Sequence, residues 1–571
     1  MLGFAEGSMI GDSLQGSTEV FDAVVVGSGA TGGWAAKELT EAGLRVALLE
    51  AGRMLVPEKD FTEHVMPWQT KYRGYSPEIT RTRPIQTRCY ACMEYNYDWF
   101  VNDYESPYTT EPGKPFNWFR ARILGGRSLV WGRQSYRLSD LDFKAASHDG
   151  YGDDWPLSYQ ELAPWYDKAE RFAGISGAAE GVPQLPDGQF QPPMAMTCGE
   201  LMLRKAAKEK FGRTVTIGRT ANLTAPLNGR APCHYCGPCE RGCMTHSYFN
   251  SPTTTIAAAQ ATGKLTLFTD AVVSHVTTDP ANPRATGVRY VHRLTRQTRE
   301  LRARAVVLCA QSLESCRILL NSANHRFPNG LANSSGALGH YLMDHATGFG
   351  ASGELPGLDP RPWAGPPQRP NGIYVIRFRN LTDRHPDFIR GYGYQGGAGP
   401  GFNMSAEGYG NAFKERVRQG AYWIGLGGFG ECLARWENFC ELDKNTVDAW
   451  GIPALHFNAA YGENERKMGR QMAADAAEML EAAGAKNISV QAAISPFGHA
   501  IHECGVARMG DDPRKSVLNK YCQSHDVKNL FVMDGSAFVS VGNQNPTLTM
   551  MALVCHGCDY LAKQAGRGDL S

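Results

Sequence analysis

The sequence predicts an α/β protein in which a Rossmann-like nucleotide-binding domain is split along the chain by an inserted α+β domain built on a mainly antiparallel sheet. Three observations lead to this prediction. A strand, a glycine-rich turn and a helix follow one another near the start, strands and helices alternate up to about residue 345, and the same pattern returns after residue 496. We therefore predict a first part over 20–345, an inserted domain over 346–495 and a C-terminal part over 496–571.

The glycine-rich turn carries the fingerprint G-x-G-x-x-G at Gly27, Gly29 and Gly32, after the apolar run 23–26 and before a helical pattern. The first glycine permits the tight turn, the second lets the backbone approach a pyrophosphate, and the third lets the helix lie close on the strand. A second apolar run ends in Glu50, where a carboxylate can accept hydrogen bonds from a ribose. Such turns also occur in ordinary parallel sheets, but here the strand, the helix and the acidic residue stand in the required order.

The remaining elements of the first part follow from composition and spacing. Residues 53–118 are polar, aromatic and rich in proline, which predicts a long excursion over the nucleotide-binding fold. Ser158 and, three residues later, Glu161 predict a capping box at the start of an amphipathic helix. Apolar runs predict strands at 265–268, 271–276 and 305–309, the last leading into a helix over 312–321.

The inserted domain has a different pattern. We predict a strand at 374–379 and a glycine-rich loop over 391–410. A helix over 463–483 carries apolar residues at helical spacing, which we interpret as core rather than as cofactor contacts: Met468, Met472, Met479 and Leu480. After residue 496 we predict a strand at 529–533 and a helix over 547–562.

Charge and hydropathy exclude several classes of partner. The net charge is +1 and no basic block stands out, so neither nucleic acid nor an acidic membrane surface is an expected partner. No apolar run reaches the roughly 18 to 20 residues of a membrane helix, so membrane association is expected only through a partner. The first twenty residues lack a basic start and an apolar middle, so we expect a loose leader rather than a secretory signal.

Four of the fifteen cysteines, Cys233, Cys236, Cys239 and Cys243, follow the spacing C-x2-C-x2-C-x3-C. Thiolates this crowded can ligate an iron–sulfur cluster from one loop, here 231–245. Structural zinc usually takes ligands from two separated pairs, so it would require a distant partner pair. Disulfides are a third reading. We favour the iron–sulfur reading over the other two; the distant pairs are Cys89–Cys92 and Cys555–Cys558.

Several longer motifs resemble one family. With the opening fingerprint, the segments GGRSLVWG (125–132), VVLCAQSLESCRILLNS (306–322), HECGVARMG (502–510) and NLFVMDGSAFVSVGNQNPTLTMMAL (529–553) are similar to the glucose–methanol–choline (GMC) oxidoreductases and keep the family's order. The likeness spans nearly the whole chain and is weakest in the inserted domain. It extends in particular to bacterial FAD-dependent sugar dehydrogenases that carry an iron–sulfur cluster, including those acting on glucose, gluconate, fructose and the 3-position of glucosides.

The resemblance implies that FAD, rather than NAD, occupies the nucleotide site. The related pyranose oxidases attach their flavin through a histidine at the position of Val130, and because valine cannot form that bond we expect FAD without a covalent link. The residues that the resemblance places at the cofactor are Gly27, Gly29, Gly32, Glu50, Gly125, Gly126, Ser128, Val273, Asp534, Gly535, Asn545 and Thr547.

The family oxidises an alcohol by passing a hydride from carbon to flavin N5 while a histidine removes the hydroxyl proton. The motif places this base at His502, and an imidazole suits the task because its pKa lies near working pH. The second catalytic position falls on Asn545, whose amide can orient the substrate oxygen. Asn-Pro also suits a turn before a helix, and His502 could be a core histidine; His499 is the nearest competitor for the base.

The resemblance also bears on the cysteine loop. In glucose dehydrogenases of this type three ligands spaced C-x5-C-x3-C hold a three-iron cluster, and Cys233, Cys239 and Cys243 match that spacing. Cys236 is additional and completes the pattern of a four-iron cluster, so both cluster types stay open. FAD accepts two electrons at once, and such a cluster transfers them onward one at a time.

We therefore expect an FAD and iron–sulfur dehydrogenase acting on a secondary hydroxyl of a sugar or glycoside, at C3, to give a 3-keto sugar. The resemblance implies a small chaperone-like subunit that carries the export signal and a cytochrome c-type acceptor, and hence a periplasmic location, with a cytoplasmic one as the alternative. The competing functions are an FAD sugar or alcohol oxidase that uses oxygen and a non-catalytic electron-transfer subunit. Candidate sugar contacts in the inserted domain are Trp363, Tyr374, Arg377, Arg379, Tyr392, Trp423, Phe429 and Trp436, each of which could equally be core.

Overall fold

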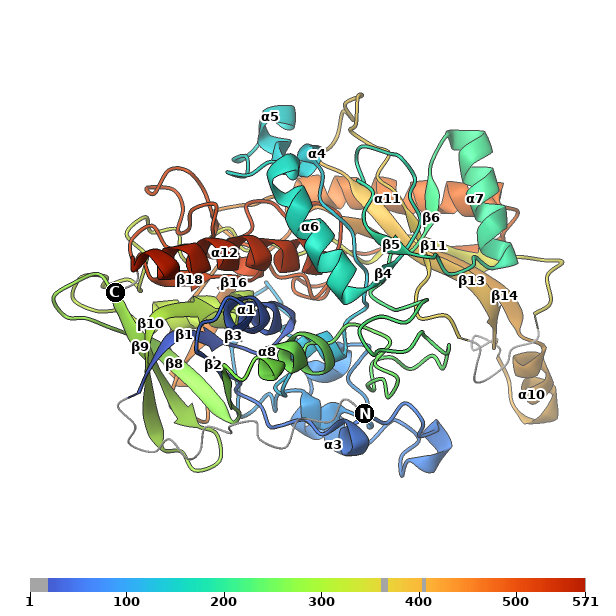
Figure 1. Cartoon of the computed structure of the whole chain (residues 1–571). Helices are drawn as coiled ribbons and strands as arrows, with labels where there is room; N and C mark the ends of the chain where they lie inside the picture. Colours follow the sequence, from blue (N-terminus) through green and yellow to red (C-terminus); the bar gives the residue numbers. More distant parts are fainter. Residues whose placement is uncertain (1–18, 361–367, 403–406, 570–571) are drawn as a thin grey trace.

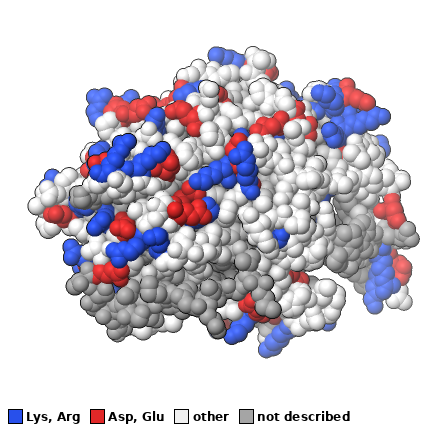
Figure 2. Space-filling model, in the orientation of Figure 1, with Lys and Arg blue, Asp and Glu red and all other residues white. Residues whose placement is uncertain are grey.

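The computed structural model describes residues 19–360, 368–402 and 407–569 (Figure 1). Residues 1–18 of the segment expected to be a leader and the candidate sugar contact Trp363 lie outside these ranges. No helix within them is long and apolar enough to cross a membrane. On the face shown in Figure 2, basic and acidic residues are interspersed and neither forms a large patch, in keeping with the near-zero net charge.

The nucleotide-binding part is built on a seven-stranded sheet. Its parallel core runs in the order β7 (Leu265–Phe268), β2 (Val46–Leu49), β1 (Val20–Val26), β10 (Thr298–Leu308) and β18 (Leu530–Val532). Strands β8 (Ala271–Thr278) and β9 (Ala285–His292) extend it in antiparallel fashion from the first half of β10. In register, Val26 lies beside both Leu49 and Leu308, so three carboxyl ends meet at one edge of the sheet.

Helices cover this sheet. Helix α1 (Ala30–Glu41) packs against α12 (Thr547–Arg567) and α8 (Ala257–Ala261), and α12 packs on α6 (Tyr159–Ala173) (Figure 1). The predicted capping box of α6 is confirmed, because Ser158 accepts from the backbone of Glu161 while the Glu161 carboxylate accepts from Ser158. Helix α9 (Ser312–Leu320) follows β10 as predicted. The shorter helices are α2 (Pro57–Asp60), α3 (Pro77–Thr82), α4 (Asp140–Phe143) and α5 (Ala145–Asp149).

A second, six-stranded antiparallel sheet lies beside the first (Figure 1). Its order is β17 (Lys486–Ala492), β11 (Phe349–Glu354), β14 (Ala421–Gly430), β13 (Tyr392–Gly401), β12 (Ile373–Val375) and β6 (Val215–Ile217). Helix α11 (Glu463–Ala482) buries the predicted methionine stripe against it, which confirms that these side chains are core. Strand β6 and helix α7 (Cys198–Phe211) join this sheet from before residue 346, and α10 (Gly410–Gln419) precedes β14.

The prediction of a loop over 391–410 was wrong, because half of this stretch is β13, a central strand of the second sheet. A methyl group at Gly396 would lie 2.2 Å from the carbonyl oxygen of Gly425 on the neighbouring strand. Glycine is therefore required here for close strand packing rather than for a turn. Two small sheets complete the fold: β15 (Phe439–Val447) with β16 (Pro453–Asn458) and β3 (Thr109–Thr110), and β4 (Ile175–Ser176) with β5 (Phe190–Gln191).

Candidate active site

A cavity of about 350 Å³ opens at the carboxyl edge of the parallel strands, where open α/β sheets bind their ligands. The excursion 53–118 contributes part of its wall, through Cys89 and Phe100 among others. Two predicted cofactor residues, Gly32 and Gly125, pack directly behind the lining. The other predicted residues line the cavity together with the predicted base: Gly27, Gly29, Glu50, Gly126, Ser128, Val273, His502, Asp534, Gly535, Asn545 and Thr547.

The three fingerprint glycines differ in what surrounds them. Gly27 has φ +93°, and a methyl group there would lie 2.5 Å from the carbonyl oxygen of Cys309. A methyl group at Gly32 would lie 1.7 Å from the carbonyl oxygen of Gly27, so this glycine lets α1 lie on β1. A methyl group at Gly29, the N-cap of α1, would meet no protein atom within 4 Å. The helix N-terminus is therefore open toward the cavity, as a pyrophosphate site requires.

Glu50 follows β2 and faces the same cavity. One carboxylate oxygen accepts from the Ser28 hydroxyl at 2.5 Å and from the Ser28 backbone at 3.2 Å, and the other accepts from the Gly52 backbone at 2.7 Å. Burial raises the pKa of this carboxyl. Because a carboxylate offers about four acceptor positions, capacity remains for a ribose hydroxyl.

The second glycine pair is tied to the first turn. The Gly125 backbone donates to the Ser28 hydroxyl at 2.8 Å, and the Ser128 hydroxyl donates to the Gly125 carbonyl at 2.6 Å. A methyl group at Gly126 would lie 3.7 Å from the Cα of Gly29, so the two turns lie next to each other in the cavity wall. Val130 also lines the cavity. These residues fit a dinucleotide with a flat ring system, such as FAD, and the valine side chain has no atom that could form a covalent bond to it.

The structure brings His502 and Asn545 together. The Asn545 amide nitrogen lies 3.2 Å from Nε2 of His502, and its oxygen accepts from Gln395 at 2.6 Å. His499 does not line the cavity; its Nδ1 instead lies 3.5 Å from the Asn117 amide nitrogen. Of the two candidate bases, His502 lines the cavity and His499 does not.

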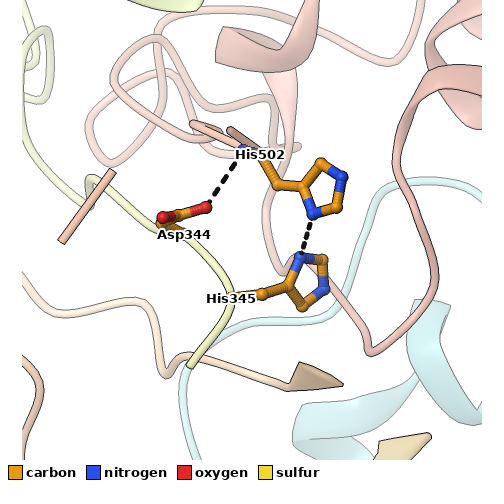
Figure 3. Close-up of side chains that lie close together, drawn as sticks. All are labelled: Asp344, His345 and His502. Atoms are coloured by element: carbon orange, nitrogen blue, oxygen red, sulfur yellow. Dashed lines mark hydrogen bonds between the residues drawn. The ribbon is translucent and has the colours of Figure 1, made fainter. Parts of the chain in front are cut away.

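Two buried residues of this site, Asp344 and His345, were missed at the sequence level. Nδ1 of His345 lies 2.8 Å from Nδ1 of His502, and the Asp344 carboxylate accepts from the His502 backbone at 3.0 Å (Figure 3). Burial raises the pKa of Asp344 to about 7, with a further contribution from Glu503, and lowers the pKa of His345 to about 4. Burial also lowers the pKa of His502 well below its usual value, so both imidazoles are neutral at neutral pH. The only sequence signal that could have indicated these two residues was an Asp-His pair just before the inserted domain.

The four clustered cysteines lie in one loop behind the cavity wall. Burial raises the pKa of the Cys236 thiol to about 12, with further contributions from the neighbouring thiols of Cys239, Cys243 and Cys233. Tyr248 packs on Cys239 and Cys243 and donates to the carbonyl of Leu129 at 2.8 Å, next to the cavity residue Val130. In the described part of the chain no three thiol sulfurs lie within 4.8 Å of one another.

The two other cysteine pairs and the aromatic candidates lie elsewhere. Cys89 is in the cavity wall, and Cys555 and Cys558 are buried in α12. Of the described candidate sugar contacts, only Phe429 lines the cavity. Tyr374 and Tyr392 are buried core residues, and Trp436 stacks on His340 outside the cavity.

Comparison with known proteins identifies the family. Two models described as GMC oxidoreductase match residues 21–347 and 435–553. The 2-methyl-1,2-propanediol dehydrogenase of Mycolicibacterium austroafricanum is 30% identical over 96% of this chain and 96% of its own length. The fructose dehydrogenase large subunit of Gluconobacter japonicus is 28% identical over 96% of this chain and 98% of its own length.

A solved structure shares the fold. The crystal structure of pyridoxine 4-oxidase from Mesorbium loti superposes with a TM-score of 0.58 at 19% identity, covering 94% of this chain and 98% of that chain. At this identity the likeness concerns the fold alone.

Proposed function

Because this chain belongs to the GMC oxidoreductase family and is an FAD-dependent oxidoreductase acting on CH–OH groups of sugars or alcohols, we propose that it is a dehydrogenase that oxidises a secondary hydroxyl of a sugar or glycoside with His502 as the base. The observation that carries this proposal is the pairing of His502 with Asn545 in the cavity that begins at the fingerprint glycines. FAD, when bound there, supplies the hydride acceptor.

The residues of the chain supply proton transfer and orientation. His502 would take the hydroxyl proton at Nε2, because Nδ1 is already engaged with His345. Asn545, held by Gln395, would donate to the substrate oxygen and fix its direction. Phe429 and Ile501 line the cavity nearby and would exclude water from the reacting groups. The 3-hydroxyl of a glycoside is our proposed position of attack.

We further propose that Cys233, Cys236, Cys239 and Cys243 hold an iron–sulfur cluster that supplies single-electron transfer to an acceptor. The four residues follow one another in a single loop at the spacing C-x2-C-x2-C-x3-C, which suits an iron–sulfur cluster, whereas structural zinc usually takes its ligands from two separated pairs. Tyr248 and Leu129 place this loop directly behind the cavity wall.

The proposed acceptor is a cytochrome c-type partner, together with a small subunit that carries the export signal, and the proposed location is the periplasm. The relative named as a large subunit supports an assembly of several chains.

Analysis of anaerobically purified protein for flavin, iron and acid-labile sulfide tests the cofactors. Stopped-flow reduction by glycosides and by their 3-deoxy analogues tests the reaction. We expect flavin and iron in the same protein, reduction by glycosides, and no reduction by the 3-deoxy forms. Rapid oxygen consumption by iron-free protein would instead support an oxidase, and failure of every sugar and alcohol would overturn the proposal.

A further inference from the structure

We propose that Asp344 and His345 are positioning residues that clamp His502, fixing both its backbone and the tautomer of its ring, an inference that rests on the proposed role of His502 as the base. Both residues come from a part of the chain more than 150 positions away from His502. They hold it at two points (Figure 3).

The first point is the backbone. The Asp344 carboxylate accepts from the backbone N–H of His502 at 3.0 Å and from that of Ala500 at 3.1 Å. Ile501, between these donors, has φ +65°, a left-handed conformation that is strained for a β-branched residue. Strained backbone persists at functional sites only where its surroundings hold it in place. The two hydrogen bonds to Asp344 supply that restraint.

The second point is the ring, and the proton positions follow from the acceptors. Nε2 of His345 lies 3.0 Å from the carbonyl oxygen of Gly542, which can only accept, so Nε2 carries hydrogen. His345 is neutral, so its Nδ1 is bare. Nδ1 of His502, 2.8 Å away, must then be the donor, because two bare nitrogens would repel each other. Nε2 of His502 is left bare, facing the amide of Asn545.

The residues beside this contact are anchored by hydrogen bonds. The side chain of Asn543, which follows Gly542, donates to the Tyr374 hydroxyl at 2.8 Å. The Tyr461 hydroxyl donates to the backbone carbonyl of His345 at 2.8 Å. The chain of hydrogen bonds runs from the Gly542 carbonyl through His345 to His502, whose bare nitrogen would take the substrate proton. After that transfer, neutral His345 still accepts from Nδ1 of His502 and stabilises its positive charge.

The kinetic test compares His345→Leu, which removes the acceptor, with His345→Asn, which places an amide oxygen near the position of Nδ1. We expect His345→Leu to lower kcat for substrate oxidation about 100-fold. Loss of a partner that orients a functional histidine typically costs about 10–100-fold, and loss of the correct tautomer about 10⁴-fold. We expect His345→Asn to recover about tenfold of that loss, with KM and FAD content unchanged in both variants. His499→Leu, in the same segment but outside the cavity, is the matched control.

A measurement independent of catalysis uses full-length protein labelled with ¹⁵N-histidine. The NMR signals that are lost in His502→Asn belong to His502 and should show hydrogen on Nδ1 and none on Nε2. The signals that are lost in His345→Asn belong to His345 and should show hydrogen on Nε2 and none on Nδ1. A His502 ring with hydrogen on Nε2, or a folded His345→Leu variant within about twofold of the parent rate, would overturn the clamp. If no alcohol is oxidised by the parent protein, the proposed function fails while the tautomer measurement still decides this inference.

Discussion

Replacing Gly29 by alanine should weaken FAD binding strongly while leaving the fold intact. The backbone at Gly29 has φ −61°, which alanine adopts without strain, and a methyl group there meets no protein atom within 4 Å. At such a site the substitution stabilises a protein by about 0.4–1 kcal/mol through the unfolded state. The new methyl group would project into the cavity where the pyrophosphate has to approach the helix N-terminus.

Gly32→Ala is the matched contrast, because the same change three residues later has the opposite effect. The added carbon would lie 1.7 Å from the carbonyl oxygen of Gly27, a backbone atom that can move only if α1 shifts away from β1. Overpacking of this kind typically costs about 1–3 kcal/mol of the free energy of unfolding, or more where backbone must shift. Gly32→Ala should therefore destabilise the apoprotein itself.

The assay is denaturant unfolding of each protein with and without FAD. At a free FAD concentration of about 100 Kd, binding should add about 2.7 kcal/mol to the parent's free energy of unfolding. If Gly29→Ala weakens binding about 100-fold, the same concentration adds only about 0.4 kcal/mol. The reasoning would be refuted if Gly29→Ala kept the full increment, or if its apoprotein were as unstable as that of Gly32→Ala.

Three further predictions concern catalysis, the cysteine loop and acid stability. His502→Ala should slow flavin reduction by substrate about 1,000-fold in stopped-flow measurements, within the range for a lost general base, while His499→Ala retains the parent rate; equal effects of the two would contradict the assignment. Cys239→Ala should remove protein-bound iron and sulfide but keep FAD, whereas the exposed Cys198→Ser keeps all three; iron retained by Cys239→Ala would exclude this ligand. Asp344→Asn should make stability fall more steeply as pH decreases. The folded pKa of His345 is about 4, against about 6.5 in an unfolded chain, so between these values the unfolded state alone takes up the proton. Asp344 opposes this trend, because its folded pKa of about 7 lets the folded state take up a proton over the same range. Relative to the parent, the variant should therefore lose about 1.4 kcal/mol more of its free energy of unfolding for each pH unit of acidification. Urea unfolding of both proteins across pH 6.5 to 4 tests this, and free energies of unfolding that fall in parallel would disprove the opposition.

Local chemistry made the nucleotide-binding part predictable from the sequence. Gly27 permits the tight turn, Gly29 leaves the helix N-terminus open, and Gly32 lets the helix lie close on the strand. Because each feature requires glycine at one particular position, their spacing is enough to predict the turn. The capping box of α6 and the methionine stripe of α11 are likewise local patterns. His502 and Asn545 were found through motifs, and the fold brings their side chains within 3.2 Å of each other.

Only the tertiary structure decided what lies between distant segments. The glycines of 391–410 predict a loop by composition. In the fold they lie in a central strand, where a larger residue would collide with carbonyl oxygens of the neighbouring strand some thirty residues later. Strand β6 joins the second sheet from outside the inserted segment for the same reason, since strand pairing is not encoded locally. His345 and Gln395 enter the site only because the fold carries them to His502 and Asn545. The sequence by itself thus determined which turn, which helix starts and which candidate base are present, whereas the hydrogen-bonded partners that set the base's orientation and tautomer were decided by packing, because they lie far away along the chain.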